Sequence, residues 1–122
     1  MPDATYESGG VRIFECAAEG PRLKTERDAV DLISATASAN AEWTVVPVSR
    51  LDAEFFSLRT QLAGAFLQKF VTYGKRIAIM GDIPAEYMES RALRDFIKEC
   101  NRGRQIWFVE NRDAFAKRLG SE

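Results

Sequence analysis

The fold is decided by residues 60–82, which read TQLAGAFLQKFVTYGKRIAIMGD. Six apolar side chains recur at helical spacing in the first part: Leu62, Ala63, Phe66, Leu67, Phe70 and Val71. This spacing predicts a helix over Thr60–Tyr73 with one wide buried face, ended by Gly74, where a left-handed residue is wanted. Arg76–Met80 is a short apolar run, typical of a central strand covered on both faces. The stretch therefore predicts a helix followed by a buried strand.

The residues before this stretch predict a hairpin, a helix and a strand. Thr5–Glu7 and Val11–Cys16 flank a Ser-Gly-Gly turn, and Gly-Gly supplies the positive φ of a tight hairpin. A helix over Glu26–Ser38 follows, and Thr25 caps it with Asp28 in a capping box.

Trp43–Val48 is rich in β-branched residues and is expected to form the next strand. Pro47 has no N–H to donate, which predicts that this strand lies near an edge of the sheet or is bulged there. Leu51–Leu58 is a connection that buries Phe55 or Phe56.

The residues after the stretch predict a helix, a strand and a last helix. Ser90–Asn101 is helical and ended by Gly103, Gln105–Val109 is a strand, and Asn111 caps a helix over Arg112–Leu119. The exposed side of the third helix carries Arg91, Arg94, Lys98 and Arg102, with Asp95 and Glu99 at pairing distance. We interpret that side as a solvated, charged helix face.

Strands that alternate with helices predict an α/β fold with a single, mostly parallel sheet flanked by helices and an N-terminal β-hairpin. The chain has 122 residues and no long linker, so we expect one domain over residues 1–122. Residues 1–10 are either a weakly ordered start or the first hairpin strand.

The composition bounds the chemistry. The chain has no histidine, which removes the commonest general base and metal ligand, so we expect no catalytic residue, metal or cofactor. Cys16 and Cys100 are expected to be reduced, buried thiols. The net charge of −1 argues against nucleic acid and anionic membranes as partners, and the absence of a long apolar run predicts a cytoplasmic protein. A homodimer is left open.

One candidate site arises because ligands of open parallel sheets bind beyond the carboxyl ends of the strands. That rule gathers Arg59-Thr60, Gly81-Asp82 and Glu110–Arg112. The candidate binding residues are Arg59, Thr60, Gln61, Asp82 and Asn111. The alternatives are structural: Thr60 as an ordinary N-cap, Arg59 as a surface ion pair with Asp82, and Asp82 as part of a turn. Gly64 within the helix predicts a close approach of another element.

Several motifs together resemble a known family. They are Phe55–Gly64, Leu67–Phe70, Tyr73, Ala78-Ile79, Gly81-Asp82, Leu93–Ile97, Glu99 and Asn101–Gly103. Over about Val11 to Leu119 the chain resembles a family of short bacterial proteins described as a domain of unknown function. That family's pattern has an acid at position 65 and Asn at 72, where this chain has Ala65 and Thr72. The resemblance therefore implies that any role of that acid is lost or moved here.

A second, more distant resemblance is to STAS domains, the anti-sigma-factor antagonists, which also open with a hairpin. Aligning their phosphorylated turn with Leu58–Leu62 places Arg59 at the phosphoserine, so this resemblance implies the architecture and a regulatory bias without the phosphoswitch.

Two functions remain from the sequence. The first is a non-enzymatic protein-interaction or regulatory module, acting through the Arg59–Gln61 turn and the exposed side of the Thr60–Tyr73 helix. The second is a binding protein or enzyme that takes a small molecule or anion at a strand-end site near Arg59, Asp82 and Asn111. A pocket that converges on those three residues would favour the second function, and a flat apolar patch there would favour the first.

Overall fold

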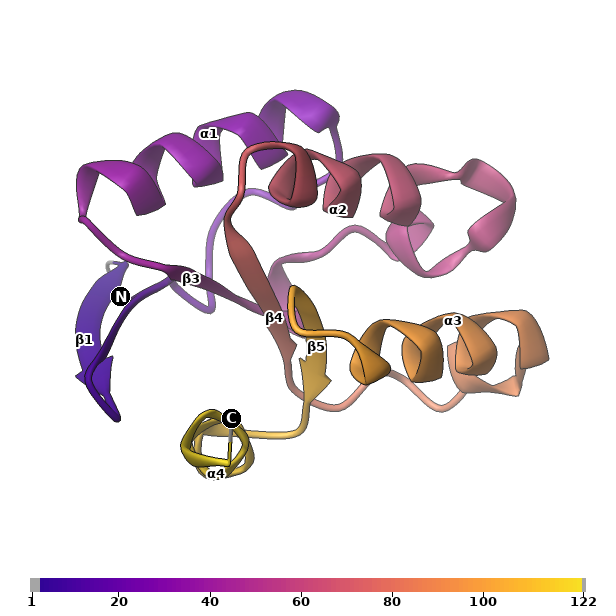
Figure 1. The fold of residues 1–122 in the computed structure, drawn as a ribbon. Helices are drawn as coiled ribbons and strands as arrows, with labels where there is room; N and C mark the ends of the chain where they lie inside the picture. Colours follow the sequence, from indigo (N-terminus) through magenta and orange to yellow (C-terminus); the bar gives the residue numbers. More distant parts are fainter. Residues whose placement is uncertain (1–2, 122) are drawn as a thin grey trace.

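A computed structural model describes residues 3–121 of the chain. In this part of the chain, five strands form one sheet in the order β1-β2-β3-β4-β5 (Figure 1). The strands are β1 (Ala4–Ser8), β2 (Val11–Glu15), β3 (Trp43–Pro47), β4 (Arg76–Met80) and β5 (Ile106–Val109). The helices are α1 (Glu26–Ser38), α2 (Leu62–Thr72), α3 (Arg91–Arg102) and α4 (Arg112–Gly120). The predicted α/β class, with a mostly parallel sheet and an N-terminal hairpin, is confirmed.

The hairpin forms as its turn predicts. β1 and β2 pair antiparallel from Ser8 opposite Val11 to Ala4 opposite Glu15. Gly9 and Gly10 have φ values of 57° and 81°, which a two-residue hairpin turn requires. The first hairpin strand predicted within residues 1–10 is thus present at residues 4–8, while residues 1 and 2 lie outside the described residues.

Short-range signals place the helix ends. The Asp28 N–H donates to Thr25 Oγ1 (3.1 Å) and the Thr25 N–H donates to Asp28 Oδ2 (2.9 Å), so the predicted capping box is present. Gly103 ends α3, and the Asn111 side chain caps α4 by accepting from the Ala114 N–H (2.8 Å). The predicted ion pairs on α3 also form, Arg91 with Asp95 and Arg102 with Glu99.

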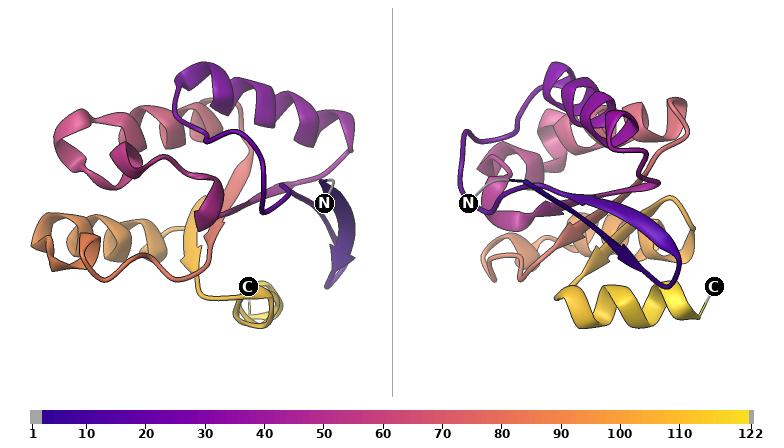
Figure 2. Two further views of the ribbon diagram at one scale, coloured as in Figure 1. Left: turned by 180° about the vertical axis from the view of Figure 1, so that it is seen from behind. Right: turned by 90° about the vertical axis from the view of Figure 1, so that its left-hand side faces the viewer.

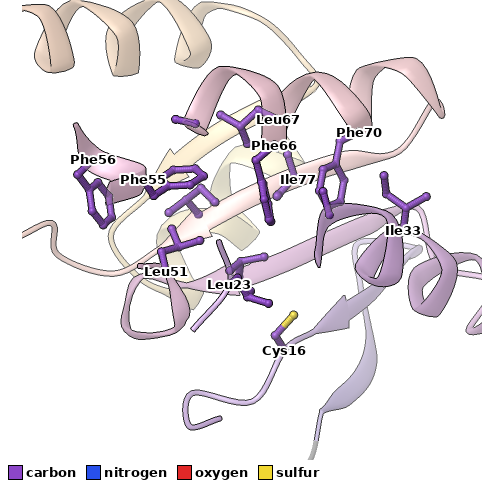
Figure 3. Packing of buried hydrophobic residues seen from close by; sticks show 14 of the residues in the cluster. Cys16, Leu23, Ile33, Leu51, Phe55, Phe56, Phe66, Leu67, Phe70 and Ile77 are labelled. Carbon is purple, nitrogen blue, oxygen red and sulfur yellow. The ribbon is translucent and has the colours of Figure 1, made fainter. Parts of the chain in front are cut away.

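The two faces of the sheet carry separate clusters of apolar side chains. On one face, α1, α2 and α3 pack around a large cluster, part of which is drawn in Figure 3. On the other face, α4 contributes Phe115 and Leu119 to a smaller cluster built on Ile13, Trp43, Val45, Ala78 and Trp107. Figures 1 and 2 show α4 across the sheet from α1 and α2. This division follows from the strand geometry, because successive side chains of a strand point to opposite faces.

The prediction that β3 lies near an edge or is bulged at Pro47 is wrong. β3 is the middle strand, and Pro47 is its last residue, opposite Met80. The Cys16 N–H donates to Val45 O (2.9 Å), so Pro47, two residues on, faces the β2 side, where the ladder has already ended. A missing N–H therefore disrupts no ladder at this position.

Seven side chains on the apolar sides of the predicted helices or in the predicted strands are expected to be nearly inaccessible to solvent: Phe66, Phe70, Ile77, Ile79, Phe96, Ile97 and Phe108. Four of the seven are. Phe66, Phe70, Ile77 and Ile79 are at most 1% exposed, and both Phe55 and Phe56 are buried. Phe96, Ile97 and Phe108 are only half-buried, contrary to the prediction. β5 is a margin strand that α3 covers incompletely, so side chains on the α3 side of β5 stay partly open.

Candidate functional site

The carboxyl ends of β4 and β5 border a hollow of about 440 Å³. Its walls are apolar and its rim carries two carboxylates; the lining residues are Gly81, Asp82, Ile83, Met88, Ile97, Phe108, Val109 and Glu110. Ile97 and Phe108 are half-buried because they line this hollow. Asp82 and Glu110 are exposed and have no ion-pair partner within residues 3–121. The structure thus brings Asp82 together with Glu110, from adjacent strand ends.

Arg59 lies elsewhere on the same side of the molecule. It is exposed and lines a separate hollow of about 370 Å³ beside the start of α3, together with Glu86, Tyr87 and Ser90. Asp82 does not line that hollow, and Asn111 caps α4 instead of facing either one. The sequence placed Arg59, Asp82 and Asn111 in one site, whereas the structure distributes them along the edge. Their functional role stays a prediction.

The turn before α2 differs from the prediction. α2 begins at Leu62, and Arg59 and Thr60 belong to a 3₁₀ helix, η3 (Leu58–Thr60). The Thr60 hydroxyl lies 2.9 Å from Glu54 O and 2.8 Å from Ser57 O, so it is tied to the preceding chain. Gln61 takes the N-cap position with φ 59° and no side-chain cap bond. Thr60 therefore lies one residue before the N-cap, and its hydroxyl ties the connection to α2 because it also accepts from the Leu62 N–H (3.2 Å).

The most exposed positions of α2 carry no charge, and its single charged residue, Lys69, is partly exposed and pairs with Glu26 of α1 (3.5 Å). The exposed residues along it and at its two ends are Gln61, Gly64, Gln68, Thr72 and Tyr73, which we call the outer ridge. Tyr73 is 57% exposed. The exposed side of α3, in contrast, carries arginine, lysine and acidic side chains. The sequence analysis proposed this side of the helix as a binding surface. The signal is present in the sequence, because positions 61, 64, 68 and 72, which are spaced by three or four residues, carry no charged side chain.

The sequence predicted that another element approaches Gly64 closely, and the described part of the chain shows no such approach. A Cβ built at Gly64 meets no atom within 4 Å, so no other element of the described chain approaches it closely. A glycine in an exposed helix interior costs about 1 kcal/mol relative to alanine. A non-glycine residue in the left-handed region, here Gln61, adds a cost of about 1 kcal/mol or more. Both of these costs in folding stability arise on the outer ridge, within the four residues from Gln61 to Gly64.

At the opposite margin of the sheet, charges are paired. The Arg112 guanidinium donates to Glu15 Oε2 (3.1 Å) and lies 4.5 Å from the centre of the Tyr6 ring. The hydrogen bond and charge of Glu15 raise the pKa of Arg112, and burial together with Glu15 raises the pKa of Tyr6 to about 12. These groups hold α4 to the hairpin.

Neither thiol has the character of a nucleophile. Burial raises the pKa of the Cys16 thiol to about 12 and that of the Cys100 thiol to about 11. A thiol reacts as its thiolate, so both side chains are inert near neutral pH. Among residues 3–121, no group of three or more Cys, Asp or Glu side chains is arranged to hold a metal ion, and no helix has the length and apolar character to cross a membrane.

The raised pKa values of the two thiols predict that the folded protein loses stability at alkaline pH. A group whose pKa is higher when folded contributes stability below its unfolded pKa, and loses it as the pH rises towards the folded value. For Cys16 these limits are 9.0 and about 12, so the free energy of unfolding should fall as the pH rises through that window. Urea unfolding at a series of pH values measures this. The free energy of unfolding of Cys16→Ala should fall less steeply with pH than that of the wild type. Equal slopes for the two proteins would contradict the prediction.

The comparisons with known proteins give one match. A family model described as a domain of unknown function (DUF4180) matches residues 8–119. No curated protein and no solved structure matches the chain. The resemblance to STAS domains stays a prediction.

Proposed function

Because the chain belongs to the DUF4180 family of domains of unknown function, we propose its role from its own geometry: a cytoplasmic, non-enzymatic protein-interaction module. The partner binds the Arg59–Gln61 turn and the outer ridge of α2. The observation that carries this proposal is the uncharged outer ridge, since charged residues are depleted at the centres of protein interfaces.

The backbone of the same surface supports the proposal. Gln61 and Gly64 each lower the stability of the free chain, and no contact within the described residues compensates for Gly64. A glycine without a Cβ lets the backbone of a partner approach the helix closely. Arg59 lies at the start of this surface, exposed and without an ion-pair partner in the described chain. A guanidinium so placed can donate two parallel hydrogen bonds to a partner carboxylate.

Photo-crosslinking in the native host tests the proposal. A photoreactive residue at position 72, on the outer ridge, should give a discrete protein adduct, and one at position 98, on the charged side of α3, should give none. Gly64→Lys should reduce the adduct roughly tenfold, which corresponds to about 1.4 kcal/mol of binding energy. Ser34→Lys, at an exposed position of α1, is the matched control and should leave the adduct unchanged.

Two results would contradict the proposal. One is equal adduct formation at positions 72 and 98, which would indicate random collision. The other is an adduct that Gly64→Lys leaves intact, provided that circular dichroism shows the variant to be folded.

A second candidate function is small-molecule binding at the hollow bounded by Asp82 and Glu110. It is favoured by the volume of about 440 Å³, which falls within the range of ligand sites, and by its apolar walls. The two carboxylates favour a cationic ligand over the anion that the sequence suggested. Native mass spectrometry that finds a co-purified small molecule, lost in Asp82→Lys, would support this function in place of the first.

A further inference from the structure

The outward side of β1 carries backbone groups that no strand within residues 3–121 pairs. The Glu42 N–H donates to Arg12 O (2.9 Å) and the Cys16 N–H donates to Val45 O (2.9 Å), so even-numbered residues of β2 face β3. Odd-numbered residues of β2 therefore face β1, where their partners are Ala4, Tyr6 and Ser8. By the same alternation, the N–H and C=O groups of Thr5 and Glu7 point away from the sheet.

The other margin of the sheet is closed. The Asn101 side chain, at the end of α3, accepts from the Phe108 N–H (2.7 Å) and donates to Phe108 O (3.3 Å). One amide side chain thus takes the place of a neighbouring strand at the centre of β5. Such a device prevents a second chain from pairing with an edge strand.

β1 has few comparable protections. Its five residues, Ala4–Ser8, include no proline and no lysine, and they pair with β2 without a bulge. Both Thr5 and Glu7 are exposed. In the views of Figures 1 and 2, β1 lies at the margin of the sheet, away from α2 and α3.

We propose that β1 is a homodimer interface, in which two copies of the chain pair their β1 strands antiparallel and form one continuous ten-stranded sheet. A second copy fits because the pattern is self-complementary. A two-fold axis at Tyr6 places Thr5 of each copy opposite Glu7 of the other, so each outward N–H meets an outward C=O.

The side chains fit the same register. Glu7 stands opposite Thr5 of the other copy, so the two carboxylates are not directly opposed. The two Tyr6 rings meet on the face covered by α4, and each is already held in place by its hydrogen bond to Glu15 Oε1 (3.2 Å) and by Arg112. Cross-strand aromatic pairs add stability. The area is small, so the dimer is weak and depends on concentration. This interface lies apart from the outer ridge of α2, and its test is independent of the proposed function.

Analytical ultracentrifugation of the full chain tests the proposal. The wild-type protein should form dimers as its concentration is raised to about 1 mM. Thr5→Pro should remain monomeric at every concentration, because the Thr5 N–H points outward and its loss leaves the β1–β2 ladder intact. Ala53→Pro is the matched control. Proline is tolerated at the first position of a helical turn, and Asp52 before it has an extended backbone, so this variant should dimerise as the wild type does.

The register has its own readouts. Tyr6→Cys should form an intermolecular disulfide on mild oxidation, because residues at the two-fold axis face each other, whereas Thr5→Cys should form little. Amide hydrogen exchange at Thr5 and Glu7 should slow as the wild-type protein is concentrated. A wild type that stays monomeric at the highest concentration would overturn the proposal, even if β1 accepts an extended peptide of another protein. Dimers that persist in Thr5→Pro, or disulfides that form equally at positions 5 and 6, would also overturn it.

Discussion

Phe70→Ala is expected to lower the free energy of unfolding by about 3–5 kcal/mol. Phe70 is fully buried, its ring centre lies 5.9 Å from that of Phe66, and it joins α2 to the large cluster that α1 and the sheet share (Figure 3). Truncation leaves a cavity that the close-packed surroundings cannot fill. Urea unfolding followed by far-UV circular dichroism measures the loss.

The control for this prediction lies two residues away. Gln68→Ala, on the exposed side of the same helix, should change the free energy of unfolding by less than about 0.5 kcal/mol. A loss below about 1 kcal/mol for Phe70→Ala would show that the buried face of α2 is assigned wrongly.

Trp107→Ala is expected to cost a similar amount, about 3–5 kcal/mol, on the opposite face of the sheet. Trp107 is 1% exposed, and its ring centre lies 4.5 Å from that of Trp43 and 6.1 Å from that of Phe115. Its indole N–H donates to Gly103 O (2.9 Å), a carbonyl at the end of α3. The Arg118 guanidinium lies 4.1 Å from the ring centre. The substitution therefore removes an aromatic contact, a hydrogen bond and a cation–π contact together.

Trp107→Phe is the control, because it keeps a ring in the cluster and loses the hydrogen bond to Gly103. Its cost should be clearly smaller than that of Trp107→Ala, in urea unfolding followed by circular dichroism. Equal costs for the two variants would indicate that the hydrogen bond to Gly103, and not the packing of the ring, accounts for the loss of stability.

A feature of the fold could be predicted from the sequence when the residues that produce it are close together in the chain. The capping box of Thr25 and Asp28, the Gly-Gly turn and the stop at Gly103 act within a few residues, so the sequence places them correctly. The start of α2 is misplaced by two residues, because Gln61 takes the N-cap position with a left-handed backbone, and the Thr60 hydroxyl, which accepts from the Leu62 N–H, also bonds to Glu54 O, six residues earlier. No local propensity reveals such a contact.

The candidate site shows the limit of a rule based on topology. Beyond the carboxyl ends of parallel strands, the rule gives the correct edge for Asp82 and Glu110. It fails for Arg59 because two short 3₁₀ helices, η1 (Val48–Arg50) and η2 (Ala53–Phe56), separate the end of β3 from η3, which contains that residue. The chain thereby carries Arg59 to the start of α3 and away from Asp82.

By itself, the sequence determined the order of the helices and strands, the absence of histidine chemistry and the membership of the family, since periodicity, caps and motifs are properties of neighbouring residues. Only the tertiary structure decided that Trp107 is buried while Phe108 is half-buried, and that Asn101 pairs with Phe108 at the β5 edge while no strand within residues 3–121 pairs with the outer side of β1. Those outcomes depend on which segments meet across the sheet. The burial of a side chain and the pairing of an edge strand are set by residues distant in the sequence, which local spacing does not encode.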